Sequence, residues 1–209
     1  MSGKQKKTPI ISFLLAGNSA VGKTSIVDQY QKQEINPNHI TTLGVDCRLI
    51  TKPFMVDGQQ VTIKAKMWDS AGQQRFQNLV LSAIQNTQGV LLIYDITEPE
   101  TFSDCEGWIG KISGVKDLSK FPIFFVGNKK DLEAKRKITK AQAEEFAKKH
   151  DFKYFEVSAL TGEGIQQVID EFIVEVYKKR TGKNGISLDD ANKDNKSGCC
   201  LFSKEKKNK

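Results

Sequence analysis

Continuous apolar runs constrain the fold of this chain more than any other feature of its sequence. They occupy residues 10–16 (IISFLLA), 90–96 (VLLIYDI) and 122–128 (PIFFVGN). A strand that is apolar on both faces belongs inside a sheet that is covered on both sides, which is the usual setting of a parallel sheet. Two further strands are predicted at residues 61–68 and 153–159. The chain should therefore contain a buried, mostly parallel sheet.

Segments with helical periodicity separate these runs. Helices are predicted over residues 23–31, 102–115, 139–150 and 164–180, with Thr139 as an N-cap. Strands that alternate with helices indicate a doubly wound α/β fold.

One pair of segments departs from this alternation of strands and helices. Residues 48–56 and 59–68 flank Asp57-Gly58, a dipeptide typical of tight hairpin turns. The pattern predicts an antiparallel strand at the sheet edge, and Pro53 is expected to limit its pairing.

Charge is concentrated at the two ends of the chain. The 209 residues carry a net charge of +7 and are 38% hydrophobic, which suits a single domain with one core. Residues 1–7 contain three lysines, and residues 178–209 contain ten basic against four acidic residues, so residues 8–177 hold 19 basic against 21 acidic residues. A nucleic-acid-binding domain would carry its basic patch on folded elements. Basic ends instead favour solvated linkers or contact with anionic lipid.

The chain shows no secretory signal and no apolar run of the ~18 residues that a membrane-spanning helix needs. Its four cysteines have no zinc-type spacing, and they are Cys47, Cys105, Cys199 and Cys200. We expect a cytosol-facing protein whose membrane contact is peripheral.

The segment GNSAVGKT, residues 17–24, directly follows the first strand and opens the first helix. Glycines let backbone N–H groups curl around phosphate oxygens, and the helix N-terminus adds partial positive charge. In such a loop Lys23 would meet the β- and γ-phosphates and the Thr24 hydroxyl would bind Mg²⁺. A purely structural turn is the alternative. The candidate phosphate-binding residues are Gly17, Asn18, Ser19, Ala20, Val21, Gly22, Lys23, Thr24 and Ser25.

A phosphate loop alone leaves ATP and GTP open. The segment NKKD, with Asn128, Lys129 and Asp131, leaves the end of a buried strand, where ligands of such folds bind. The Asp131 carboxylate can accept from the N1–H and 2-amino donors of guanine, which adenine lacks in that arrangement. A backbone N–H of Ser158-Ala159-Leu160 is placed to read the guanine O6. By itself, NKKD would more often be a solvated turn; its place at a strand end beside a phosphate loop favours base reading.

Together these motifs resemble the Ras-like small GTPases, and within them the Rab branch. TTLGVD (41–46) resembles the first switch, WDSAGQ (68–73) the second, and YDIT (94–97) follows the Rab pattern. The likeness is collinear from about residue 10 to 180.

The resemblance implies a fold and a division of the chain. The fold is that of a P-loop NTPase, a three-layer, doubly wound α/β fold with a six-stranded, mostly parallel sheet, one antiparallel edge strand and helices on both faces. Residues 1–9 form a basic N-terminal extension, residues 10–180 the GTPase domain, and residues 181–209 a disordered tail.

The resemblance also implies a mechanism that uses GTP, GDP and Mg²⁺. Thr42 would bind Mg²⁺ directly and Asp69 through water, while the Gly72 N–H would contact the γ-phosphate. Gln73 would orient the attacking water as the catalytic residue. Intrinsic hydrolysis should be slow, because the sequence shows no arginine finger.

The implied partners are an exchange factor, a GTPase-activating protein, GTP-dependent effectors, a GDP-dissociation inhibitor and a membrane surface, with no nucleic acid. The protein would be a monomer at the cytosolic face of an endomembrane, acting in vesicle trafficking. A GTP-holding scaffold with little hydrolysis and a soluble, unlipidated switch are the alternatives.

Some positions depart from the family pattern. Ile35 stands where an aromatic usually covers the guanine face, so nucleotide loss should be faster, unless Ile35 is a core residue of a shifted loop. Gln74 replaces a glutamate, Leu160 a lysine, and residues 81–89 lack the usual tyrosines, which indicates altered partners.

Cys199 and Cys200 resemble the geranylgeranylated pair of Rab proteins, and two lipid chains would give stable anchoring. However, LFSKEKKNK follows them, whereas such cysteines normally lie near the carboxyl end. Trimming, palmitoylation, basic adhesion and an unmodified tail stay open.

Overall fold

The computed structural model describes residues 8–32, 44–70, 72 and 77–182. Six strands form one sheet in the order β2-β3-β1-β4-β5-β6. Every neighbouring pair is parallel except β2 and β3. The strands are β1 (Ile10–Ala16), β2 (Val45–Val56), β3 (Gln59–Ser70), β4 (Val90–Asp95), β5 (Ile123–Asn128) and β6 (Lys153–Glu156).

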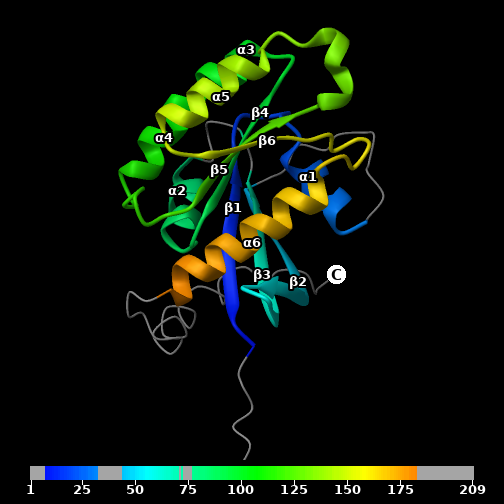
Figure 1. Ribbon diagram of the computed structural model, residues 1–209. Coiled ribbons are helices and arrows are strands. Elements are labelled where there is room, and N and C mark those ends of the chain that lie inside the picture. The colour runs from blue at the N-terminus through cyan, green and yellow to red at the C-terminus, as the bar shows by residue number, and fades with distance from the viewer. Residues whose placement is uncertain (1–7, 33–43, 71, 73–76, 183–209) are drawn as a thin grey trace, which may run out of the picture.

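Helices cover both faces of this sheet (Figure 1). They are α1 (Lys23–Tyr30), α2 (Gln77–Gln85), α3 (Pro99–Ser103), α4 (Cys105–Ser113), α5 (Lys140–Lys149) and α6 (Ile165–Thr181), with a short 3₁₀ segment η2 (Lys130–Lys135). The α/β fold with one antiparallel edge strand, predicted from the apolar runs and the hairpin signal, is confirmed.

Side chains of the central strands point alternately into two cores. Phe13 and Leu15 pack with α1 and α6, whereas Leu14 and Ala16 pack with α2, α4 and α5. Both faces of β1, β4 and β5 are consequently buried. This explains why their sequences are continuously apolar.

The helix predicted at residues 102–115 begins earlier and is divided. It starts at Pro99, whose fixed φ suits the first helical position, and α3 gives way to α4 at Asp104. The prediction for Thr139 is confirmed, because its hydroxyl accepts from the Gln142 N–H and completes a capping box.

The expectation that Pro53 limits the hairpin is wrong. Pairing of β2 with β3 is continuous from Val45↔Ser70 to Val56↔Gln59, including Pro53↔Thr62. Because β2 is an edge strand, a residue without an N–H is tolerated where that position faces the open edge.

Candidate nucleotide-binding site

The phosphate loop lies between β1 and α1 at the carboxyl edge of the sheet, and two of its glycines are required there. A Cβ on Gly17, whose φ is +140°, would lie 2.1 Å from the Ile93 carbonyl oxygen. A Cβ on Gly22, the N-cap of α1 with φ +94°, would lie 2.3 Å from Asn128 Nδ2. The loop is thus pressed against β4 and β5, and only glycine fits these positions.

Lys23 begins α1 and folds its side chain back over this loop. Its Nζ donates to the carbonyl oxygens of Gly17 at 3.0 Å and Asn18 at 2.7 Å. Burial lowers the pKa of Lys23 to about 8, and the negative charge of Asp69 opposes this change. The ammonium therefore lies where phosphate oxygens would approach, held in place by backbone acceptors.

Thr24 and Asp69 meet beside the lysine. The Thr24 hydroxyl donates to Asp69 Oδ2 at 2.5 Å, and Asp69, near the end of β3, is 3% exposed. Burial raises the pKa of Asp69, although the Thr24 hydrogen bond and Lys23 lower it. A hydroxyl and one carboxylate are oxygen donors of the kind that Mg²⁺ takes when substrate phosphates and water complete its shell. The two residues fit such an ion.

Gly72 packs against the phosphate loop from outside. A Cβ at Gly72 would lie 2.2 Å from the Ser19 backbone nitrogen and 2.3 Å from the Asn18 carbonyl carbon. Only a residue without a side chain can approach so closely. The second predicted switch therefore touches the loop through bare backbone.

Asn128, at the end of β5 and 1% exposed, joins the predicted base-reading segments to the phosphate loop. Its Nδ2 donates to the Val21 carbonyl oxygen at 2.8 Å, and its Oδ1 accepts from the Ala159 N–H at 3.1 Å. Three segments that are distant in sequence are held together by this one side chain.

Asp131 is exposed, and a hydrogen bond to one of its carboxylate oxygens orients its side chain. Its Oδ1 accepts from the Ser158 hydroxyl at 2.5 Å, and Ser158 is fully buried. The same hydroxyl oxygen accepts from the Thr161 N–H at 3.1 Å. Leu160 is 69% exposed beside these groups. The carboxylate is therefore fixed in rotation at the surface.

Lys129 is ion-paired with a residue outside the NKKD motif. Its Nζ lies 2.6 Å from Asp95 Oδ2, at the end of β4, and its backbone has φ +69°. Asp95 is buried, and its Oδ1 accepts from the Thr97 N–H at 2.8 Å and hydroxyl at 2.7 Å. In the sequence, Asp95 stands out only as part of the YDIT segment.

The side chain of Asn18 points away from the loop centre. It contacts Asp104 and Trp108 on the α3–α4 side of the sheet. Neither partner had been predicted as a site residue.

Four predicted site features lie outside the described residues. They are Ile35, the magnesium ligand Thr42, the catalytic Gln73 and the cysteine pair Cys199 and Cys200.

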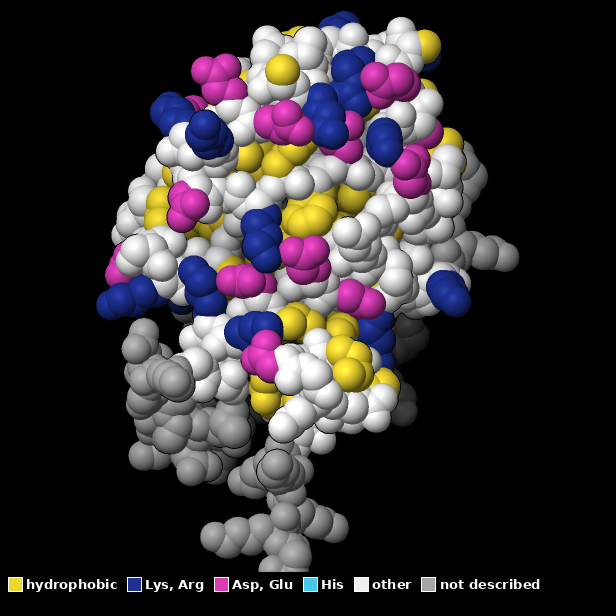
Figure 2. Space-filling model, viewed as in Figure 1, with side chains coloured by type: hydrophobic (Ala, Val, Ile, Leu, Met, Phe, Trp, Pro, Cys, Tyr) yellow, Lys and Arg dark blue, Asp and Glu magenta, His cyan; other side chains and the backbone are white. Residues whose placement is uncertain are grey.

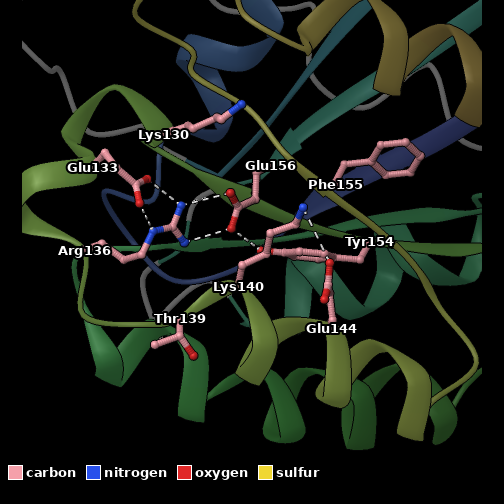
Figure 3. A pocket seen from close by; sticks show the side chains of 9 residues that line it. All are labelled: Lys130, Glu133, Arg136, Thr139, Lys140, Glu144, Tyr154, Phe155 and Glu156. Atoms are coloured by element: carbon pink, nitrogen blue, oxygen red, sulfur yellow. Dashed lines mark hydrogen bonds and ion pairs between the residues drawn. The ribbon is translucent and has the colours of Figure 1, made fainter.

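The cleft in Figure 3 lies beside the NKKD segment, whose Lys130 is one of its lining residues. Its volume is about 610 Å³, and its lining residues come from η2, the start of α5 and β6. Arg136 lies between Glu133 at 2.7 Å and Glu156 at 2.8 Å. Because its strongest charges already neutralise one another, we interpret the cleft as a brace for the segment after NKKD.

The chain is similar in sequence to known proteins along most of its length. The model of the Ras family matches residues 12–178. The chain is 31% identical to the Ras-related protein Rab-13 of Canis lupus familiaris, over 92% of this chain and 96% of that protein. It is 32% identical to the Ras-related protein RabC of Dictyostelium discoideum, over 91% and 97%. It is 30% identical to the Ras-related protein SEC4 of Candida albicans, over 96% and 100%. The chain therefore belongs to the Ras family, as a divergent, Rab-like member.

Proposed function

We propose that this chain is a molecular switch that binds GTP, hydrolyses it slowly and changes partners between its GTP and GDP states. One observation carries the proposal. Asn128 hydrogen-bonds both the phosphate loop, at Val21, and the loop after β6, at Ala159. A phosphate cradle and a base-reading edge are thus fixed relative to each other, as binding of one nucleotide requires.

At the phosphate end, the N–H groups of residues 17–25 and the N-terminus of α1 would surround the α- and β-phosphates. Lys23 exchanges one of its carbonyl acceptors for a phosphate oxygen, which restores the charge that burial disfavours. Thr24, Thr42 and Asp69 would hold Mg²⁺. When bound, Mg²⁺ neutralises the charge that develops between the β- and γ-phosphates.

At the base end, the Asp131 carboxylate accepts the N1–H and the 2-amino group of guanine, and Ser158 keeps it in that orientation. The Lys129 stem covers one face of the ring, held by Asp95. The Ala159 N–H donates to Asn128 Oδ1 in this structure, so the neighbouring Leu160 N–H would be the donor to O6, and Ile35 would lie near the base.

Hydrolysis and switching follow from the same geometry. Gln73 orients a water for attack on the γ-phosphorus. The Gly72 N–H, whose residue already rests on the phosphate loop, donates to the γ-phosphate. Loss of that group releases both Thr42 and Gly72, and the two switch segments change together.

Single-turnover hydrolysis of bound GTP tests the proposed catalysis. Wild-type protein should hydrolyse GTP slowly, and the Gln73→Leu variant should retain GTP for much longer. Gln60→Leu, at the far end of the β2–β3 hairpin, is the control and should behave as wild type. Equal rates near zero for all three proteins would instead indicate a GTP-holding scaffold.

We also propose a domain organisation and a place of action. Residues 10–180 form the GTPase domain, and residues 1–9 and 181–209 are extensions. The likeness to Rab proteins supports a role in vesicle trafficking at the cytosolic face of an endomembrane, with an exchange factor, a GTPase-activating protein, effectors and a GDP-dissociation inhibitor as partners.

Membrane association would occur through the tail. No described helix combines the length and the apolar character needed to cross a bilayer. We propose lipidation at Cys199 and Cys200. The intact mass of the protein from its native cells tests this, with the double serine variant as the control. An unmodified wild-type mass would refute lipidation.

Figure 2 shows how charge is distributed on one face of the folded body. On the face that it shows, lysine and arginine side chains alternate with aspartate and glutamate, and the described residues form no continuous basic patch there.

A further inference from the structure

Asn18 connects the phosphate loop to the start of α4, and phosphate binding does not explain this contact. Its Nδ2 donates to Asp104 Oδ2 at 2.6 Å, and its Oδ1 accepts from Trp108 Nε1 at 3.0 Å. A carboxylate only accepts and an indole N–H only donates, so the amide can take one orientation alone. The contact therefore fixes both the position and the rotation of the Asn18 side chain.

The backbone of the same residue lies between two groups of the nucleotide site. Its carbonyl oxygen accepts from Lys23 Nζ at 2.7 Å. On the other side, a Cβ on Gly72 would lie 2.5 Å from that same oxygen. A shift of the Asn18 peptide would thus move the acceptor of Lys23 and the surface on which Gly72 rests.

The helix behind Asn18 is firmly held. Cys105, Trp108 and Ile112 of α4 are buried in the core on that face of the sheet. Glu106, on the same helix, is ion-paired with Lys149 of α5 at 2.6 Å. Asp104 and Trp108 consequently offer rigid anchor points.

We propose that Asn18 is a positioning residue, braced by Asp104 and Trp108, that holds its own carbonyl oxygen against Lys23 and Gly72. This inference rests on the proposed nucleotide site. The side chain does not bind phosphate; it acts through Lys23 and Gly72. The brace should therefore influence how long nucleotide stays bound and how fast γ-phosphate is lost.

The Asn18→Asp substitution provides a sharp perturbation. It replaces the donor that faces Asp104 with a second carboxylate, so the two side chains repel each other. We expect GDP release from the full-length protein to accelerate by roughly 5- to 30-fold, equivalent to the loss of a contact of ordinary strength. Single-turnover GTP hydrolysis should slow in the same variant.

Adding a second substitution restores a donor opposite the new carboxylate at residue 18. In Asn18→Asp/Asp104→Asn, the new carboxylate accepts both from the amide at residue 104 and from Trp108. Asp104 makes no side-chain hydrogen bond that caps α4, so its replacement leaves the helix start intact. We expect the release and hydrolysis rates of this double variant to return to within about threefold of wild type.

Glu106→Gln is the matched control, because it weakens the contact of α4 with α5 without touching the phosphate loop. It should lower the thermal unfolding temperature at most slightly and leave both rates unchanged. The inference is overturned if Asn18→Asp releases GDP at the wild-type rate, if the double variant is no better than Asn18→Asp, or if Glu106→Gln accelerates release equally. Wild-type protein that binds no GDP would refute the proposed function itself, and the inference with it.

Discussion

Replacing Asp131 with asparagine should change which base the protein binds. In the structure one carboxylate oxygen accepts from the Ser158 hydroxyl at 2.5 Å. An asparagine must keep its carbonyl oxygen on that hydroxyl, because the hydroxyl donates there. Its NH₂ group is then turned toward the place where the guanine 2-amino group would lie.

The magnitude follows from the groups involved. One hydrogen bond to a charged acceptor is lost, worth about 1.5–3 kcal/mol, and two donors then face each other unsatisfied at a similar cost. The sum of about 3–6 kcal/mol predicts roughly 10²- to 10⁴-fold weaker GDP binding. Xanthine has an oxygen in place of the 2-amino group, so the same amide should donate to it, and xanthosine diphosphate should bind the variant more tightly than GDP.

Displacement of a fluorescent GDP analogue by GDP and by xanthosine diphosphate measures both effects. Glu163→Gln is a suitable control, because Glu163 lies near Asp131 but pairs with Lys130 at 2.5 Å. It should keep the wild-type preference. An Asp131→Asn variant that still prefers GDP would refute the assigned base readout.

Three further predictions concern the surroundings of the site. Asp95→Asn should keep the Thr97 contacts but release Lys129, and GDP dissociation measured by stopped flow should accelerate roughly 5- to 30-fold, whereas an unchanged rate would refute the role of Asp95. Burial opposes ionisation of Glu156, but hydrogen bonds from Arg136 and Tyr154 outweigh burial and lower the pKa of Glu156 below the ordinary 4.5. The ionised Glu156 therefore stabilises the fold above pH 4.5, and this stabilisation is lost as the pH falls through the lowered pKa. Urea unfolding of Arg136→Gln should accordingly show a deficit of about 2 kcal/mol at neutral pH that shrinks in acid, and a constant deficit would contradict this account. Finally, Ile35→Phe should slow GDP release by adding aromatic stacking on the base, and a rate equal to or faster than that of wild type would remove the idea.

The sequence predicts the layered core well, for a local reason. Strands buried on both faces must be continuously apolar, and the runs at residues 10–16, 90–95 and 123–128 could hardly be anything else. The Thr139 cap was equally predictable, because its partner Gln142 stands three residues away. Where the evidence for a feature lies within a few residues, reading the pattern is sufficient.

Contacts between distant segments were not predictable in this way. Nothing near Asn18 in the sequence indicates that its side chain faces Asp104 and Trp108, 86 and 90 residues away. Asp95 likewise shows its link to Lys129 only when β4 and β5 lie side by side. The sequence motifs identified what each loop can bind, whereas the packing of the sheet decides which side chains hold those loops in place.

The nucleotide preference of the full-length protein shows whether its binding site selects guanine. Purified protein with Mg²⁺ would be loaded with fluorescent GDP and challenged with GTP, GDP, ATP or ADP. We expect displacement by GTP and GDP at concentrations at least 100-fold lower than by ATP or ADP, because adenine offers the Asp131 carboxylate no hydrogen-bond donors in that arrangement. Equal displacement by the adenine nucleotides, or no retention of GDP at all, would contradict it.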